Sequence, residues 1–70
     1  MITFKVWTVI AVFGESQVPL KSWSATEETA MLQVEEWSET FHGRELDLRS
    51  EGKLFAIFKN GNLLQAGGAR

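Results

Sequence analysis

The pattern of hydrophobic and polar positions in the first part of the chain predicts a β-strand. Residues 2–13, ITFKVWTVIAVF, are rich in β-branched and aromatic types, which suit a pleated, half-buried surface. Successive side chains of a strand point to opposite faces of the sheet. One face therefore carries Ile2, Phe4, Val6, Ile10 and Val12, and the other carries Thr3, Lys5, Trp7, Val9, Ala11 and Phe13.

A turn and a returning strand are expected next. Residues 14–17, GESQ, are typical of a turn, and residues 18–23, VPLKSW, predict a strand that runs back along the first one. Pro19 has no N–H to donate to a neighbouring strand. This second strand is therefore expected at an edge of the sheet, or to be irregular.

Residues 24–43 predict a single helix. Its N-cap is either Ser24, which would form a capping box with Glu27, or Thr26. Gly43 is expected to end the helix in the left-handed conformation. Apolar residues recur at helical spacing and predict one buried stripe, made of Ala30, Met31, Val34, Trp37 and Phe41.

Three short strands are predicted after the helix, over residues 44–50, 54–58 and 63–66. Charged residues alternate with leucines in the first of them, which predicts one face open to water. Residues 50–53, SEGK, are expected to form a turn, and Asn60-Gly61 is a strong signal for a type I′ hairpin. The predicted fold is α+β, a five-stranded antiparallel sheet in the order ββαβββ packed against one helix.

Composition indicates one folded domain over residues 1–70. The chain is 44% hydrophobic with a single proline and no cysteine, which excludes disulfides and thiolate metal ligands. The longest apolar run, residues 6–13, is too short to span a bilayer. We therefore expect a cytoplasmic protein of a bacterial host cell, with no membrane partner.

The charges are segregated along the chain. All five acidic residues between Ser24 and His42 are glutamates, and no lysine or arginine lies among them. The rest of the chain has seven basic and four acidic residues. One acidic helix on an otherwise mildly basic protein points to a charged partner and says nothing about the fold.

Little in the chain suggests catalysis. The only histidine, His42, lies at the predicted end of the helix, where it either interacts favourably with the negative end of the helix dipole or faces solvent. Glu35 and Glu39 are spaced to meet a divalent ion weakly, but a solvated acidic face is the favoured interpretation. We expect a protein that is not an enzyme and that needs no cofactor or metal.

One helix covers only one face of such a sheet, so the second face is expected to bind a partner. We place Trp7, Val9 and Phe13 on this uncovered face, together with either Phe55 and Ile57 or Leu54, Ala56 and Phe58. A small second core formed by curling of the sheet is the equally weighted alternative. The predicted partner-binding residues are Lys5, Trp7, Lys21, Trp23, Glu35, Glu39, Arg49, Phe55 and Lys59.

Two stretches of the chain resemble small phage-encoded ββαβββ proteins. They are EETAMLQVEEW, residues 27–37, and FHGRELDLRSEGKLFAIFKNGN, residues 41–62. The chain is similar to an anti-CRISPR family that inhibits the type I-F surveillance complex, most sharply at residues 41–43, residues 52–54 and Ala56. The resemblance implies a stoichiometric inhibitor that binds a Cas subunit and blocks capture of target DNA. It assigns no functional residue.

Three alternatives stay open beside that resemblance. Residues 18–37 also resemble a small phage inhibitor of bacterial RNA polymerase, which would use the acidic helix against a basic channel. Direct nucleic-acid binding through Trp7, Phe55 and nearby lysines ranks lower, because the net charge is −2. Self-association through a sheet edge is compatible with either inhibitor, so a monomer or a homodimer is expected.

Overall fold

A computed structural model describes residues 2–41 and 43–67 and has the predicted α+β architecture. Met1, His42 and residues 68–70 lie outside the described residues. The elements, in chain order, are β1 (Lys5–Phe13), β2 (Ser16–Ala25), α1 (Glu27–Thr40), β3 (Glu45–Ser50), β4 (Lys53–Lys59) and β5 (Asn62–Ala66). No helix in these described ranges is long and apolar enough to cross a membrane.

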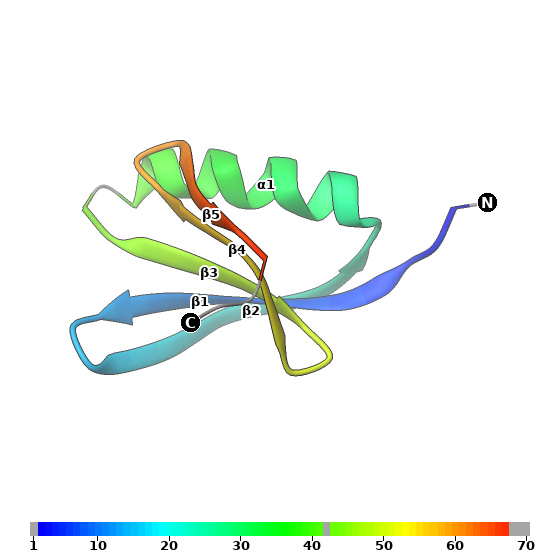
Figure 1. Ribbon diagram of the computed structural model, residues 1–70, viewed down its shortest axis with the longest axis horizontal. Coiled ribbons are helices and arrows are strands. Elements are labelled where there is room, and N and C mark those ends of the chain that lie inside the picture. The colour runs from blue at the N-terminus through cyan, green and yellow to red at the C-terminus, as the bar shows by residue number, and fades with distance from the viewer. Residues whose placement is uncertain (1, 42, 68–70) are drawn as a thin grey trace.

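The five strands form one antiparallel sheet in the order β2-β1-β3-β4-β5. Figure 1 shows α1 lying along one face of this sheet, while the β1–β2 hairpin projects away from the helix. β2 and β5 are the edge strands, which confirms the prediction from Pro19. β2 is longer than predicted, because its pairing with β1 extends from Ser16 to Ala25.

Local turn signals account for two of the hairpins. Asn60 and Gly61 both have positive φ, 52° and 79°, as a type I′ turn requires. Glu51 and Gly52 adopt the same combination, 54° and 75°, between β3 and β4. These two-residue turns set the antiparallel register of the last three strands.

The helix starts later than the capping box predicts. Thr26 is the N-cap, and its Oγ1 accepts a hydrogen bond from the Thr29 N–H at 3.2 Å. Ser24 belongs to β2 instead, so its predicted capping box is wrong and the alternative cap is confirmed. At the other end the C-cap is Phe41, and Gly43 takes the predicted positive φ of 78° two residues later.

The main core lies between α1 and the sheet. In β1 it contains Trp7, Val9 and Ala11, which belong to the face that was predicted to point away from the helix. That assignment is therefore wrong, and Trp7 is the largest fully buried side chain of the described residues. The buried members of this core are Trp7, Val9, Ala11, Ala25, Ala30, Val34, Leu46, Leu48, Ala56 and Phe58.

The opposite face of the sheet also contains buried side chains. Asp47 pairs with Ile10 of β1 and Ile57 of β4, and alternation from Leu46 and Leu48 places this row opposite the helix. Asp47 is 0% exposed, so the wet face predicted for this strand is wrong at its centre. Leu54 and Ile57 are buried as well but lie outside the helix-side core. Part of the second face is thus closed to a partner.

Candidate functional site

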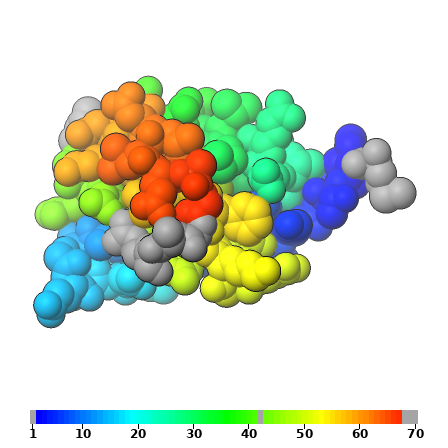
Figure 2. Space-filling model, in the orientation of Figure 1, coloured from blue at the N-terminus to red at the C-terminus, as the bar shows by residue number. Residues whose placement is uncertain are grey.

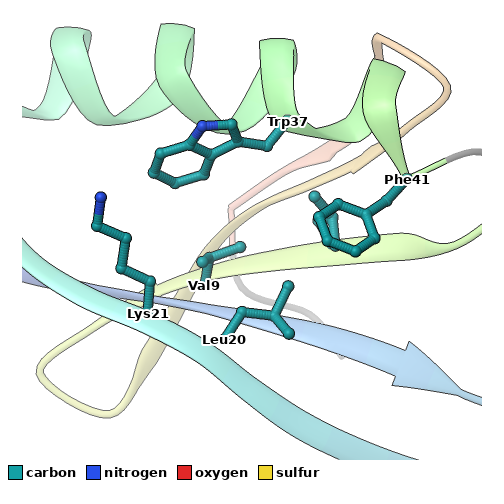
Figure 3. Close-up of a pocket in the computed structure, with 6 residues that line it drawn as sticks. Val9, Leu20, Lys21, Trp37 and Phe41 are labelled. Atoms are coloured by element: carbon teal, nitrogen blue, oxygen red, sulfur yellow. The ribbon is translucent and has the colours of Figure 1, made fainter.

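An apolar groove opens beside the helix on the side of β2. It has a volume of about 370 Å³ and is lined by Val9, Leu20, Lys21, Trp37, Phe41 and Leu46. Figure 3 shows Trp37 and Phe41 approaching it from α1, while Leu20 and Lys21 approach it from β2. The groove exists because α1 packs mainly on β4 and β3 and leaves part of the helix-facing side of β2 uncovered.

The floor of the groove is a continuation of the core. Val9 and Leu46 are both buried, and they come from the neighbouring strands β1 and β3. The register between β1 and β2 shifts after the pair Val9–Lys21, so Leu20 is the extra residue of a bulge. This bulge turns Leu20 toward the groove, where its side chain is 41% exposed.

Contacts of two tryptophans hold α1, which forms one wall of the groove, against β2. The ring centroids of Trp23 and Trp37 lie 5.1 Å apart in an edge-to-face contact. The Trp23 Nε1–H donates to Gln33 Oε1 at 2.7 Å, so the helix is held to β2 one turn before Trp37. Beyond these contacts the helix ends, and Phe41 is left 45% exposed at the end of the groove. Its assignment to the buried stripe is therefore only partly correct.

Two cations lie over aromatic rings at this site. The Lys21 Nζ is 5.1 Å from the centroid of the Trp37 ring, and the Arg44 guanidinium carbon is 4.5 Å from that of Phe13. Both distances fall in the range of cation–π contacts. The backbone N–H of Arg44 also donates to the Phe41 carbonyl oxygen, which places Arg44 near the end of the groove. The apolar surface is thus bordered by positive charge.

The other flank of the helix is acidic and faces β5. Glu39 lies against the turn between β4 and β5, since a Cβ added to Gly61 would come within 2.5 Å of its Cγ. Glu28 and Glu35 share this flank at helical spacing. The flank toward β2 carries the uncharged Gln33 and Trp37 instead. The helix therefore separates a basic, apolar side of the molecule from an acidic one.

The buried hydroxyl of Ser38 fixes the helix over this turn. It accepts a hydrogen bond from the Gly61 N–H at 2.8 Å and donates one to the Glu35 carbonyl oxygen at 2.7 Å. One turn further along, Asn60 Oδ1 accepts from the Gly43 N–H at 2.9 Å. These bonds set where α1 lies across the sheet, and so they set the width of the groove.

Of the predicted binding residues, only Lys21 lines the groove, and Trp23 packs against the lining residue Trp37. Trp7 is in the core, and it meets Phe55 edge-to-face at 4.8 Å beneath Lys5, whose Nζ lies 5.1 Å from the Phe55 ring. These three residues form a separate cluster at the other end of β1. Arg49 and Lys59 are half-buried on strands β3 and β4, and Glu35 and Glu39 lie on the acidic flank.

Five of the six residues that line the groove were not among the predicted binding residues, and three of them were missed for different reasons. Val9 was assigned to the wrong face of the sheet, and Leu20 depends on a bulge that no local pattern indicates. Phe41 was assigned to the core because its helical spacing is correct, but the helix ends there. Only the proline one residue before Leu20 was a signal of irregular pairing.

A second hollow, of about 200 Å³, lies near the turn between β3 and β4. It is lined by Thr8, Ile10, Arg49, Ser50, Glu51 and Gly52. The groove is larger than this second hollow, and its lining is more apolar.

Within residues 2–41 and 43–67 no cluster of three or more histidine, aspartate or glutamate side chains could hold a metal ion.

Comparison of the chain with protein-family models, with curated proteins and with solved structures finds no match. The likeness to type I-F anti-CRISPR proteins thus stays a prediction. The groove is the structural feature that bears on function.

Proposed function

We propose that this chain is a non-enzymatic inhibitor that acts by binding a protein complex of a bacterial host. The type I-F surveillance complex is the proposed target, on the strength of the resemblance at residues 41–43 and 52–54. The observation that supports binding is the open groove between α1 and β2. Its lining offers aromatic and aliphatic contact area and no nucleophile beside a base.

The form of the groove favours a protein over a small molecule. Small-molecule sites enclose most of the ligand surface. Here Leu20, Lys21 and Phe41 are all exposed, so the hollow is a shallow groove at the surface. An apolar centre with aromatic anchors and a charged border is typical of the buried centre of a protein interface.

The same geometry disfavours direct nucleic-acid binding. The expected stacking platform depended on Trp7, which is enclosed in the core. The two cations near the groove are over rings of the chain itself, and the far flank of the helix is acidic. Nucleic-acid binding usually requires a more extensive basic surface.

Inhibition would then require only occupation of a surface that the host complex needs. A leucine or phenylalanine side chain contributes about 1.5–3 kcal/mol when it is fully buried. Leu20 and Phe41 are each about half-exposed in the free chain and would be covered in the complex. Bound there, the chain would block capture of target DNA without being consumed.

A matched pair of variants tests this proposal. Leu20→Ser removes an apolar side chain of the groove, whereas Leu64→Ser makes the same change at a 54% exposed leucine on β5. We expect the wild-type chain and Leu64→Ser to abolish target-DNA capture by purified type I-F surveillance complex. Leu20→Ser should inhibit at least about tenfold more weakly, which corresponds to about 1.4 kcal/mol.

Circular dichroism of both variants shows whether each is folded. No inhibition by the wild-type chain at stoichiometric concentration would reject the proposed target. Equal inhibition by the two folded variants would reject the groove as the binding surface.

The acidic flank favours a second candidate, inhibition of bacterial RNA polymerase. Glu28, Glu35 and Glu39 lie along one side of the helix and would face a basic channel of the enzyme. This candidate predicts that the double charge reversal Glu35→Lys, Glu39→Lys relieves inhibition of transcription in vitro. The groove proposal predicts that the same variant still inhibits the surveillance complex.

A further inference from the structure

We propose that the groove is occupied by an extended acidic segment of the partner, which adds to the sheet as a sixth strand along β2. This inference rests on the proposed function and deepens it. It concerns the chemistry of the partner segment and the way in which its backbone is held.

β2 provides the longer of the two sheet edges. It has ten residues, and within the described part of the chain it pairs with β1 alone. Every residue from 16 to 22 is exposed to solvent. An edge of this kind presents unused N–H and C=O groups to another extended chain. Figure 2 shows the other edge strand, β5, at the front of the molecule in orange and red.

The regular part of β2 lies directly beside the groove. Residues 21–25 pair with β1 without interruption, and the bulge at Leu20 ends this run. Lys21 and Trp23 face the helix, because their partners Val9 and Trp7 belong to the helix-side core. A strand added about 4.8 Å away would place every second side chain beside them. Such side chains would cover the groove from its open side.

The side chains of β2 specify what the added strand should carry. A carboxylate facing Lys21 and an apolar side chain facing Leu20 would match the helix-side surface. On the other face β2 carries Ser22 and Ser24, which call for small polar neighbours. The expected segment thus alternates between acidic or apolar residues on one side and small polar residues on the other.

Charge selects this occupant over a second copy of the chain. Two β2 edges brought together would place Lys21 and Arg44 of both copies around the same apolar surface, with no carboxylate among the residues that line the groove. An acidic segment, by contrast, prefers one of the two sheet edges to the other. It is attracted to β2 and repelled from β5, where Glu39 lies over the hairpin turn.

The probe is a seven-residue acetylated and amidated peptide with threonine at positions one, three, five and seven. Glutamate occupies position two, leucine position four and phenylalanine position six. Titration into the ¹⁵N-labelled chain should shift the amide resonances of residues 20–25, with a dissociation constant of about 1 mM or tighter. Lys21→Glu should weaken binding at least about tenfold, whereas Lys53→Glu, a charge reversal at an exposed lysine near the far turn, should not.

N-methylation distinguishes strand addition from side-chain docking alone. Methyl groups on the odd-numbered or on the even-numbered amides block one hydrogen-bonding edge of the peptide at a time. Only one of these two sets should abolish binding. Equal binding of both methylated peptides would overturn the inference, and so would shifts confined to residues 62–66 of β5.

The inference and the proposed function fail in different ways. If the peptide shifts no amide resonance at about 1 mM while Leu20→Ser still loses inhibition, strand addition is overturned. The groove then remains the proposed binding surface. If light scattering shows that the free chain is a dimer, and hydrogen exchange shows that β2 is protected in it, a second copy occupies the groove and the inference is overturned. If the wild-type chain inhibits no surveillance complex, the proposed function fails whatever the peptide does.

Discussion

Replacing Trp7 with phenylalanine should lower the stability of the fold without weakening partner binding. The indole is 0% exposed, its Nε1–H donates to the Ala25 carbonyl oxygen at 2.9 Å, and its ring contacts Phe55. Phenylalanine keeps a buried ring but removes the donor and leaves part of the indole volume empty. An unsatisfied buried polar group costs about 1–3 kcal/mol. We therefore expect the free energy of unfolding to fall by about 2 kcal/mol.

This change is large for a chain of this size. Seventy residues at about 0.05–0.15 kcal/mol each give a total stability of roughly 4–10 kcal/mol. Complete truncation, Trp7→Ala, would cost about 3–5 kcal/mol and could leave little folded protein. The phenylalanine variant is preferable because it stays folded at 25 °C and can be assayed for inhibition under the same conditions.

Urea denaturation followed by far-UV circular dichroism measures the effect. With a slope of about 1 kcal/mol per molar urea, the midpoint should fall by about 2 M. The matched control is Trp23→Phe, since Trp23 is half-buried and its Nε1–H donates to a side chain on the surface of the helix. This control should lose less than half as much stability. If Trp7→Phe costs less than Trp23→Phe, or if it weakens inhibition instead, the assignment of Trp7 to the core is wrong.

Two further predictions concern how the helix is held. Ser38→Ala should destabilise the fold by about 1–3 kcal/mol, because it orphans the Gly61 N–H; hydrogen exchange at Gly61 should accelerate before that of the strands. Thr26→Ala should cost about 1 kcal/mol in thermal or urea unfolding through loss of the N-cap, whereas Ser24→Ala should change stability by less than about 0.5 kcal/mol. A larger effect at Ser24 than at Thr26 would contradict the position of the cap.

Much of the fold could be predicted because its signals are local. Asn60-Gly61 forms a type I′ turn wherever the flanking residues can pair, and positive φ at Gly43 follows a helix end. The helical spacing of Ala30 and Val34 identified the face that is buried. Each of these features depends on a few neighbouring residues, so no tertiary information was needed.

The choice of sheet face could not be predicted in the same way. β1 is apolar on both sides, so alternation alone does not say whether Val6 or Trp7 lies under the helix. Bulges at Leu20 and Phe55 then shift the alternation within single strands. An extra residue of this kind exchanges the two faces for the residues that follow it.

The groove depends on a property that single residues do not encode. It arises where α1 crosses the sheet, and that position is set by contacts such as the one between Ser38 and Gly61. Trp23 was predicted from its residue type, which is common at interfaces, and Lys21 was predicted as a charge at the rim of an apolar surface. Leu20 and Phe41 become part of the site only once a bulge and a helix end place them at its border.

Hydrogen–deuterium exchange of the chain in complex with purified type I-F surveillance complex tests the groove most directly. A binding site in the groove predicts slower exchange at residues 20–25 of β2 and at residues 37–41 around the end of α1, with unchanged exchange at residues 62–66 of β5. Protection centred on β5 and the acidic flank of the helix, with β2 exchanging as in the free chain, would contradict it.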